Sequence, residues 1–151
     1  LFAAVVEQAT TRFSQSIMAA VDPDMALADG QQAIGEHFLT TALTPRSLAF
    51  FRLIEGEGRK FPENISRFLR VGNDRVRAGV SEYLMRRSRF EGFALSPEDA
   101  ETAGSFFVDM VRARHQYRAL ANQDYTLTEA EIRAHVALAV RFILNGVLPR
   151  A

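Results

Sequence analysis

Apolar residues recur at steps of three and four along this chain, and this period is the feature that most constrains its fold. In the first segment, residues 1–21, apolar side chains include Val5, Phe13 and Ile17. Such spacing places side chains on one face of a helix, whereas a half-buried strand would alternate them. The chain has six segments of this kind and no strand pattern. The predicted fold class is therefore all-α, and 151 residues suit a single domain, 1–151, around one core.

Four of the helices have recognisable start signals. Asp22-Pro23, Thr44-Pro45 and Ser96-Pro97 each join an N-cap residue to a first-turn proline. Thr128 stands three residues before Glu131, which is the spacing of a capping box. With Phe61-Pro62-Glu63 opening a long fourth segment, the six helices are predicted at about 1–21, 22–43, 44–58, 61–92, 96–121 and 128–148, with a kink at Gly72-Asn73 and an end at Pro149.

The chain begins inside a helical pattern. Residues 1–7 are already apolar-periodic, with no capping residue and no turn before them, unlike the later helices. We therefore expect the chain to be a fragment of a longer protein.

The last predicted helix is apolar on nearly every side. Between residues 136 and 148 the only charged side chain is Arg141, and the only other polar one is Asn145. A helix exposed on one face would carry a polar stripe there. We expect this helix to pack on its own domain with one side and on a second chain or a covering helix with the other.

Composition excludes several classes of function. The chain has no cysteine, so it contains no disulfide, cysteine-ligated zinc or catalytic thiol. Lys and Arg together equal Asp and Glu together at 18 each, which argues against a chain that binds nucleic acid as a whole. No apolar run reaches the roughly 18 residues of a membrane span.

Motifs for catalysis or for metal and cofactor binding are not recognisable. There is no Glu-x-x-His pair of the di-iron type, no nucleophile elbow and no phosphate loop. Glu36 and His37 are adjacent and point in different directions, and Glu131 and His135 lack a second matching pair. We expect no enzyme activity, no metal and no cofactor.

Three features allow two interpretations each. His115 is either a solvated or interface histidine or a contact to a ligand. The nine basic and three acidic residues from 59 to 89 form either a solvated helix face or a surface for an anionic partner. The twelve Phe and three Tyr residues either fill the core or line an apolar cavity between helices.

Several short motifs resemble one family of transcriptional regulators. Residues 1–7 resemble the helix that follows the DNA-binding headpiece in the TetR/AcrR family. The middle of the chain is similar to the C-terminal regulatory domain of the AefR-like branch in Thr44-Pro45 with Leu48, Arg52-Leu53-Ile54, Glu57, Phe61-Pro62-Glu63 and Val76-Arg77-Ala78. The resemblance covers essentially the whole chain, with departures at Gly56, Gly58 and Gly72, where larger residues are more usual.

The resemblance implies a bacterial, cytoplasmic regulator, in most cases a repressor, whose headpiece is missing here and binds operator DNA. The C-terminal domain would bind a small effector that weakens operator binding, and it would form a homodimer through its last two helices, 97–121 and 129–148. The two-sided apolarity of the last helix supports this four-helix bundle. The expected interface residues are Ala100, Ala103, Gly104, His135, Leu138 and Phe142.

A sensor of this kind should contain a cavity between its first five helices. The helical phase of the residues predicts a mostly apolar wall for this cavity, and Arg114 or Tyr117 would supply a polar contact. Such a wall favours a flat or hydrophobic effector. The expected wall residues are Ile17, Phe38, Phe51, Phe68, Phe106, Phe107 and Met110. The alternative is a helical oligomerisation or scaffold module without an effector, which would be packed solid and lack a cavity of about 300–1,000 Å³.

Overall fold

The computed structural model describes residues 1–147, and every regular element in this range is helical. The elements are α1 (Phe2–Ala19), α2 (Leu27–Ala42), α3 (Pro45–Gly58), α4 (Pro62–Phe68), η1 (Leu69–Asn73), α5 (Asp74–Phe90), α6 (Pro97–Ala121) and α7 (Glu129–Val147). The prediction of an all-α fold is confirmed. The fourth predicted helix corresponds to α4, η1 and α5 together.

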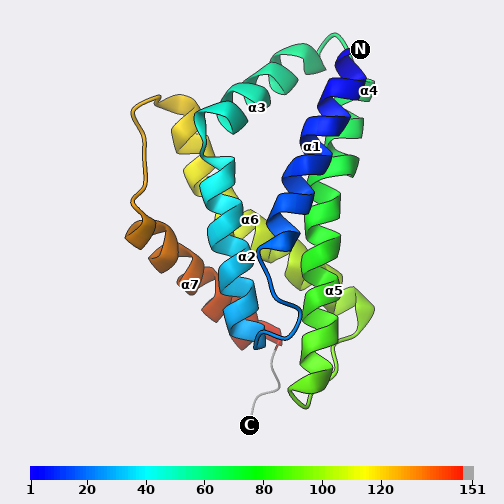
Figure 1. The fold of residues 1–151 in the computed structure, drawn as a ribbon, viewed down its shortest axis with the longest axis vertical. Coiled ribbons are helices and arrows are strands. Elements are labelled where there is room, and N and C mark those ends of the chain that lie inside the picture. Colours follow the sequence, from blue (N-terminus) through cyan, green and yellow to red (C-terminus); the bar gives the residue numbers. More distant parts are fainter. Residues whose placement is uncertain (148–151) are drawn as a thin grey trace.

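Helix α2 occupies the centre of the domain, where it contacts α1, α3, α5, α6 and α7 (Figure 1). Helices α1 and α5 run side by side along the long axis, and α3 lies across one end (Figure 1). The principal core cluster is formed by α2, α5, α6 and α7, with Ile17 from α1. Phe38 and Phe107 are the largest side chains that this core buries completely.

Three of the predicted helix starts are confirmed by their capping hydrogen bonds. The hydroxyl of Thr44 accepts from the backbone N–H of Ser47 at 3.2 Å, and that of Ser96 accepts from Asp99 at 3.0 Å. At the start of α7 the hydroxyl of Thr128 accepts from the N–H of Glu131, whose carboxylate accepts from the N–H of Thr128 at 2.7 Å. Each bond satisfies a backbone group that the first helical turn leaves unpaired.

The start of the second helix differs from the prediction. Asp22 and Pro23 lie in a turn, in which the Asp22 carboxylate accepts from the N–H of Asp24 at 2.9 Å, and α2 begins only at Leu27. The N–H of Leu27 donates instead to the carboxylate of Glu91, 2.7 Å away. A side chain 64 residues further along therefore satisfies the first turn of α2, which local sequence signals cannot indicate.

The predicted kink at Gly72-Asn73 corresponds to the π-helical segment η1, which inserts a wider turn between α4 and α5. Here η1 packs against α1. A Cβ atom added to Gly72 would come 2.1 Å from the Thr10 side chain, so only glycine permits this approach. The glycine that departs from the family pattern thus lets α1 lie close to η1.

Helix α7 has one buried side and one exposed side within the chain. Its contacts are with α2 and α6, and they bury Val136, Ala139 and Ile143. On the other side Leu138 and Phe142 are 47% and 59% exposed. Leu148 and the predicted helix end at Pro149 lie outside the described residues.

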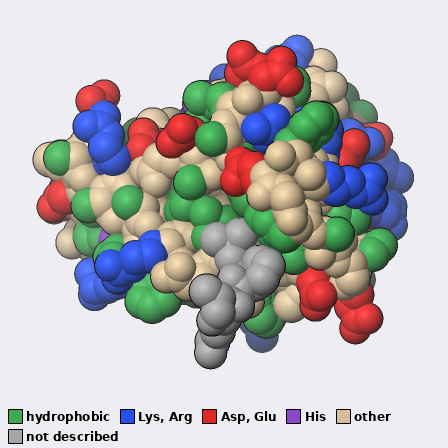
Figure 2. Space-filling view, turned by 90° about the horizontal axis from the view of Figure 1, so that it is seen from below, with side chains coloured by type: hydrophobic (Ala, Val, Ile, Leu, Met, Phe, Trp, Pro, Cys, Tyr) green, Lys and Arg blue, Asp and Glu red, His purple; other side chains and the backbone are tan. Residues whose placement is uncertain are grey.

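The end of the molecule that carries the α5–α6 connection shows hydrophobic side chains among charges of both signs (Figure 2). No helix among the described residues is long and apolar enough to cross a membrane.

Candidate ligand-binding site

A cavity of about 470 Å³ lies beside α1. Its walls come from α1, the end of α2, the first half of α3, Phe68 of α4, two residues of η1 and one face of α6. Its lining residues are Val5, Gln8, Ala9, Thr10, Arg12, Phe13, Thr41, Ala42, Thr44, Arg46, Ser47, Phe50, Phe51, Phe68, Gly72, Asn73, Arg112 and Gln116. This volume falls within the usual range for small-molecule sites, about 300–1,000 Å³.

Four phenylalanines form the apolar wall of the cavity. The Phe68 ring lies 5.9 Å from Phe50 and 6.0 Å from Phe51, measured between ring centroids. Phe13 packs edge-on against the core residue Phe38 at 5.7 Å. These tilted and edge-on contacts are favourable geometries for aromatic pairs, and they hold the rings at the cavity surface.

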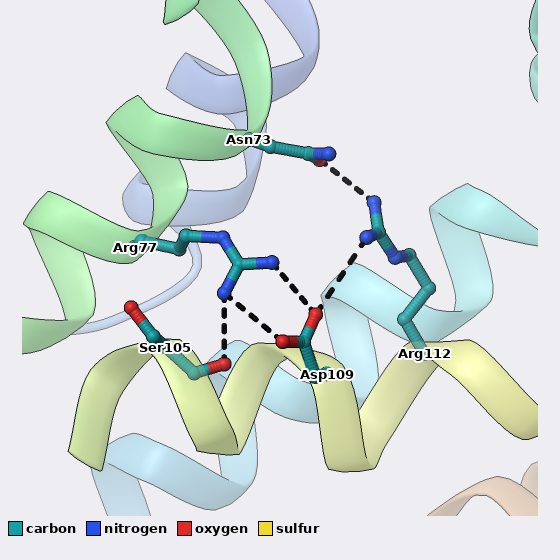
Figure 3. A network of polar contacts seen from close by, with 5 residues as sticks. All are labelled: Asn73, Arg77, Ser105, Asp109 and Arg112. Atoms are coloured by element: carbon teal, nitrogen blue, oxygen red, sulfur yellow. Dashed lines mark hydrogen bonds and ion pairs between the residues drawn. The ribbon is translucent and has the colours of Figure 1, made fainter. Parts of the chain in front are cut away.

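A polar network that includes the lining residues Asn73 and Arg112 lies between α5, η1 and α6 (Figure 3). The Arg112 guanidinium donates to the side-chain oxygen of Asn73 at 2.7 Å and lies 3.8 Å from the Asp109 carboxylate. That carboxylate accepts two hydrogen bonds from Arg77, at 2.6 and 3.2 Å, and Arg77 also donates to the backbone oxygen of Ser105 at 3.0 Å. One carboxylate therefore serves two guanidinium groups.

Arg112 is the charged residue that is most enclosed at the cavity, with a side chain only 15% exposed. Burial lowers the pKa of its guanidinium below the ordinary value, an effect that Asp109 partly offsets. The Arg112 Nε–H has no hydrogen-bond partner among the described residues. Arg112 is thus a largely enclosed cation that has Asp109 as an ion-pair partner but leaves part of its donor capacity without an acceptor in the protein.

The structure brings Phe51 and Phe68 to the cavity and puts the other predicted wall residues elsewhere. Ile17, Phe38 and Phe107 are at most 2% exposed and fill the core. Phe106 and Met110, expected to point inward, are 60% and 37% exposed. On α6, Phe107, Val108 and Val111 face the core, so the neighbouring positions 106 and 110 turn outward.

The predicted polar contacts also lie elsewhere. Arg114 and Tyr117 are exposed and do not line the cavity, whereas Arg112 and Gln116 of the same helix do. Sequence reasoning also missed Thr10, Phe13, Phe50 and Asn73. Phe13 precedes Ile17 by one helical turn, so helical spacing could have placed it on the same face of the first helix. The position of Asn73 depends on the π-helical segment, which the sequence pattern does not indicate.

His115 is not solvated and does not line the cavity: it is 8% exposed and packs against His135 of α7. Its Nδ1 lies 2.6 Å from the Tyr125 hydroxyl, and its ring meets His135 edge-on at 4.2 Å. Burial, reinforced by His135, lowers the pKa of His115 to about 4, so the ring is neutral near pH 7. The described residues contain no group of three side chains suited to a metal ion.

The predicted interface residues fall into two groups. Ala100, Ala103 and Gly104 are already buried within the chain. A Cβ atom added to Gly104 would lie 2.4 Å from the Ser81 hydroxyl, so this glycine allows α5 and α6 of one chain to approach closely. This differs from the expectation that the small residues meet a partner copy.

The second group lies on α7. His135 is half-buried, and its Nε2 lies 3.0 Å from the backbone oxygens of Met110 and Val111. Leu138 and Phe142 are exposed, as are Phe106, Met110 and Tyr117 of α6. The outward sides of α6 and α7 therefore carry large apolar side chains that the chain itself does not cover.

A sequence model of the AefR-like transcriptional repressor C-terminal domain matches residues 30–146, which is most of the chain. The chain belongs to this family. The AefR-like domain also matches a crystal structure from Mesorhizobium loti MAFF303099 whose protein is assigned to the TetR family of transcriptional regulators. The match has a TM-score of 0.71 and 16% sequence identity, and it covers 96% of this chain and 69% of that chain.

At this identity the match shows a shared fold, and it confirms the predicted TetR-type C-terminal architecture. A comparison with curated proteins finds no match. Family membership supports a role of the AefR-like domain in transcriptional regulation and points away from enzyme activity.

Proposed function

We propose that the AefR-like domain is the effector-binding and dimerisation unit of a bacterial, cytoplasmic repressor, with a separate headpiece that binds operator DNA. The cavity of about 470 Å³ is the observation that carries this proposal. The cavity opens to solvent where Val5 is 52% exposed, so a small molecule can enter it, whereas a scaffold module has no need of such a site. The aromatic wall suits an effector with an apolar body.

Coupling to the headpiece would run through α1. This helix contributes Val5, Ala9 and Phe13 to the cavity wall, and it contacts α4 and η1 across the cavity. An effector that prefers one position of α1 over another shifts the balance between the two arrangements. A coupling of about 1–3 kcal/mol would be typical of such a switch.

The proposed homodimer uses the outward sides of α6 and α7. Phe106 and Tyr117 of α6 and Phe142 of α7 are each at least 59% exposed in the single chain. Burying them against a second copy would remove a large apolar area from water, and a stable interface buries about 1,200 Å² or more in total. A two-fold arrangement would produce the predicted four-helix bundle.

The effector proposal is tested by the binding of N-phenylnaphthylamine, a neutral apolar dye whose fluorescence rises in apolar sites. We expect one dye per chain, and Phe68→Ala should weaken its binding on the order of tenfold because Phe68 contacts both Phe50 and Phe51. Phe90→Ala is the matched control, since Phe90 is 75% exposed and away from the cavity. Absence of saturable binding both of this dye and of an anionic dye with the same skeleton would favour the scaffold alternative.

The dimer proposal is tested by light scattering on the Phe142→Glu and Leu138→Glu variants. A carboxylate buried in an apolar interface is strongly unfavourable, so both variants should be monomeric or aggregate. Leu53→Glu on α3 is a control, because Leu53 is 47% exposed, like Leu138, but lies on another helix. Dimers of unchanged stability in both α7 variants would contradict the proposed interface.

A further inference from the structure

The charged residues that line the cavity are all of one sign. Arg12 of α1, Arg46 of α3 and Arg112 of α6 contribute to its walls, and no Asp or Glu lines it within the part of the chain that the structure describes. The whole chain has equal numbers of acidic and basic residues, so this bias is local to the cavity. A neutral apolar ligand would leave these three charges without a role.

The lining combines polar and aromatic side chains. Asn73 and Gln116 are at most 9% exposed; Asn73 accepts a hydrogen bond from Arg112 at 2.7 Å, and Gln116 follows Arg112 by one helical turn. Phenylalanines of α1, α3 and α4 supply the aromatic surface. Arg12 and Arg46 are exposed and form no ion pair with another described residue. The cavity therefore offers one largely enclosed guanidinium, an aromatic surface and two further cations that are exposed to solvent.

Arg112 has donor capacity that the protein leaves unused. Of its five N–H groups, one donates to Asn73 at 2.7 Å, while Asp109, at 3.8 Å, is beyond hydrogen-bond distance and is already engaged by Arg77 at 2.6 Å. A buried cation is stable only when an anion or good acceptors face it. A planar guanidinium binds a carboxylate with two parallel hydrogen bonds, which makes it a selective site for that group.

We propose that the effector is a small organic acid, whose anionic head group is bound by Arg112 and whose apolar body packs on Phe50, Phe51 and Phe68. This inference rests on the proposed sensor function and adds the charge of the ligand to it. Arg12 and Arg46 also attract the anion, but solvent screens their charges, so their contribution is smaller than that of Arg112.

Two dyes with the same aromatic skeleton test this charge preference. Anilinonaphthalene sulfonate carries an anionic group, and N-phenylnaphthylamine lacks it. Wild-type chain should bind the sulfonate on the order of tenfold more tightly, because a hydrogen bond to a charged group contributes more than a neutral one. Raising the salt concentration should weaken binding of the sulfonate and leave that of the neutral dye nearly unchanged.

Substitutions then assign the effect to one residue. Arg112→Gln should lower the affinity for the sulfonate on the order of tenfold and that for the neutral dye by less than about twofold. Arg112→Lys keeps the charge and should retain part of the preference. Arg114→Gln is the matched control, since Arg114 lies two positions away on α6, is exposed and does not line the cavity.

The outcomes separate this inference from the function on which it rests. If the neutral dye binds as tightly as the sulfonate, or if Arg112→Gln weakens both dyes equally, the sensor proposal stands and the acid inference is wrong. If neither dye binds, the sensor proposal fails and the inference fails with it. If Arg112→Gln does not fold, as judged by its thermal melting curve, the wild-type ratio together with Arg12→Gln and Arg46→Gln decides, because those two residues are exposed.

Discussion

Gly104 provides a test of how α5 and α6 pack against each other. A Cβ atom at this position would lie 2.4 Å from the hydroxyl of Ser81 and 3.1 Å from two backbone atoms of α5, the oxygen of Arg77 and the nitrogen of Ser81. The hydroxyl can rotate, although it would give up its 2.8 Å hydrogen bond to the Arg77 oxygen. The backbone atoms can move only if α5 and α6 separate.

The expected loss of stability follows from two opposing effects. Replacing glycine with alanine inside a helix favours folding by about 1 kcal/mol, and overpacking a tight contact opposes folding by about 1–3 kcal/mol. Gly104→Ala should therefore change the free energy of unfolding little or lower it by up to about 2 kcal/mol. Gly104→Val adds two methyl groups at the same contact and should lower it by at least about 2 kcal/mol.

Thermal and urea unfolding, followed by circular dichroism, measure this effect. For a chain of this size about 1 kcal/mol corresponds to a change in Tm of roughly 2–4 °C, so Gly104→Val should melt roughly 4–8 °C lower. Gly56→Ala is the matched control: nothing lies within 4 Å of its added Cβ atom, and Tm should rise by about 2 °C.

The same variant separates packing within the chain from packing against a partner. In the Phe142→Glu background, which should be monomeric, Gly104→Val should still lower stability, because Ser81 and Arg77 belong to the same chain. If Gly104→Val no longer lowered the free energy of unfolding in the monomer, Gly104 would belong to the dimer contact. A Gly104→Val chain as stable as the wild type would show that α5 and α6 do not approach this closely.

Three further predictions concern pH, capping and DNA. The pKa of His115 is lowered from 6.5 to about 4, so the unfolded chain binds more protons than the folded chain between these pH values. The free energy of unfolding should therefore fall by no more than about 3 kcal/mol as the pH drops from 6.5 to about 4. In urea titrations, His115→Gln should make this dependence on pH weaker. Thr128→Ala should destabilise the chain by about 1 kcal/mol near pH 7 in the same assay. Hydrogen bonds from the backbone and side chain of Thr128 lower the pKa of Glu131, so the part of the cap made by the Glu131 carboxylate is present above the unfolded pKa of 4.5 and is lost as the pH falls through the folded value. The bond from the Glu131 N–H to the Thr128 hydroxyl does not depend on pH in this range. The chain alone should give no sequence-specific band in a gel-shift assay, because its sequence offers no candidate recognition helix with its preceding turn and its zero net charge gives no long-range attraction to phosphate; a specific, salt-sensitive shift would contradict this.

The sequence predicted the parts of the fold that depend on local interactions. Helical period and capping residues act over three or four positions, and the starts of α3, α6 and α7 are where Thr44, Ser96 and Thr128 indicate. The start of α2 could not be predicted, because the partner of Leu27 is Glu91, which is distant in sequence.

The lining of the cavity was harder to predict than the fold. Adjacent residues on a helix differ by about 100° in direction, so a small error in phase moves a side chain from the cavity to the core or to solvent. On α6 we expected Phe106 and Met110 to point inward, but both are exposed, and the arginine that lines the cavity is Arg112 instead of the expected Arg114. On α3 and α4, Phe51 and Phe68 do line the cavity, and their contact with a ligand stays a prediction. Asn73 reaches the cavity through η1, and a π-helical turn shifts the phase of all that follows.

The distribution of the core indicates which part of the domain the proposed ligand could move. The principal core cluster contains residues of α2, α5, α6 and α7 and only Ile17 of α1, whereas no described residue of α3, α4 or η1 belongs to it. Helix α4 has no buried residue, and α3 has only Leu48 and Ile54. A displacement of α3 and α4 therefore breaks few core contacts and requires less free energy than a displacement of α6. Because α1 contacts both α4 and η1, such a displacement reaches the helix that would join the DNA-binding headpiece, while the core that holds α6 and α7 stays intact.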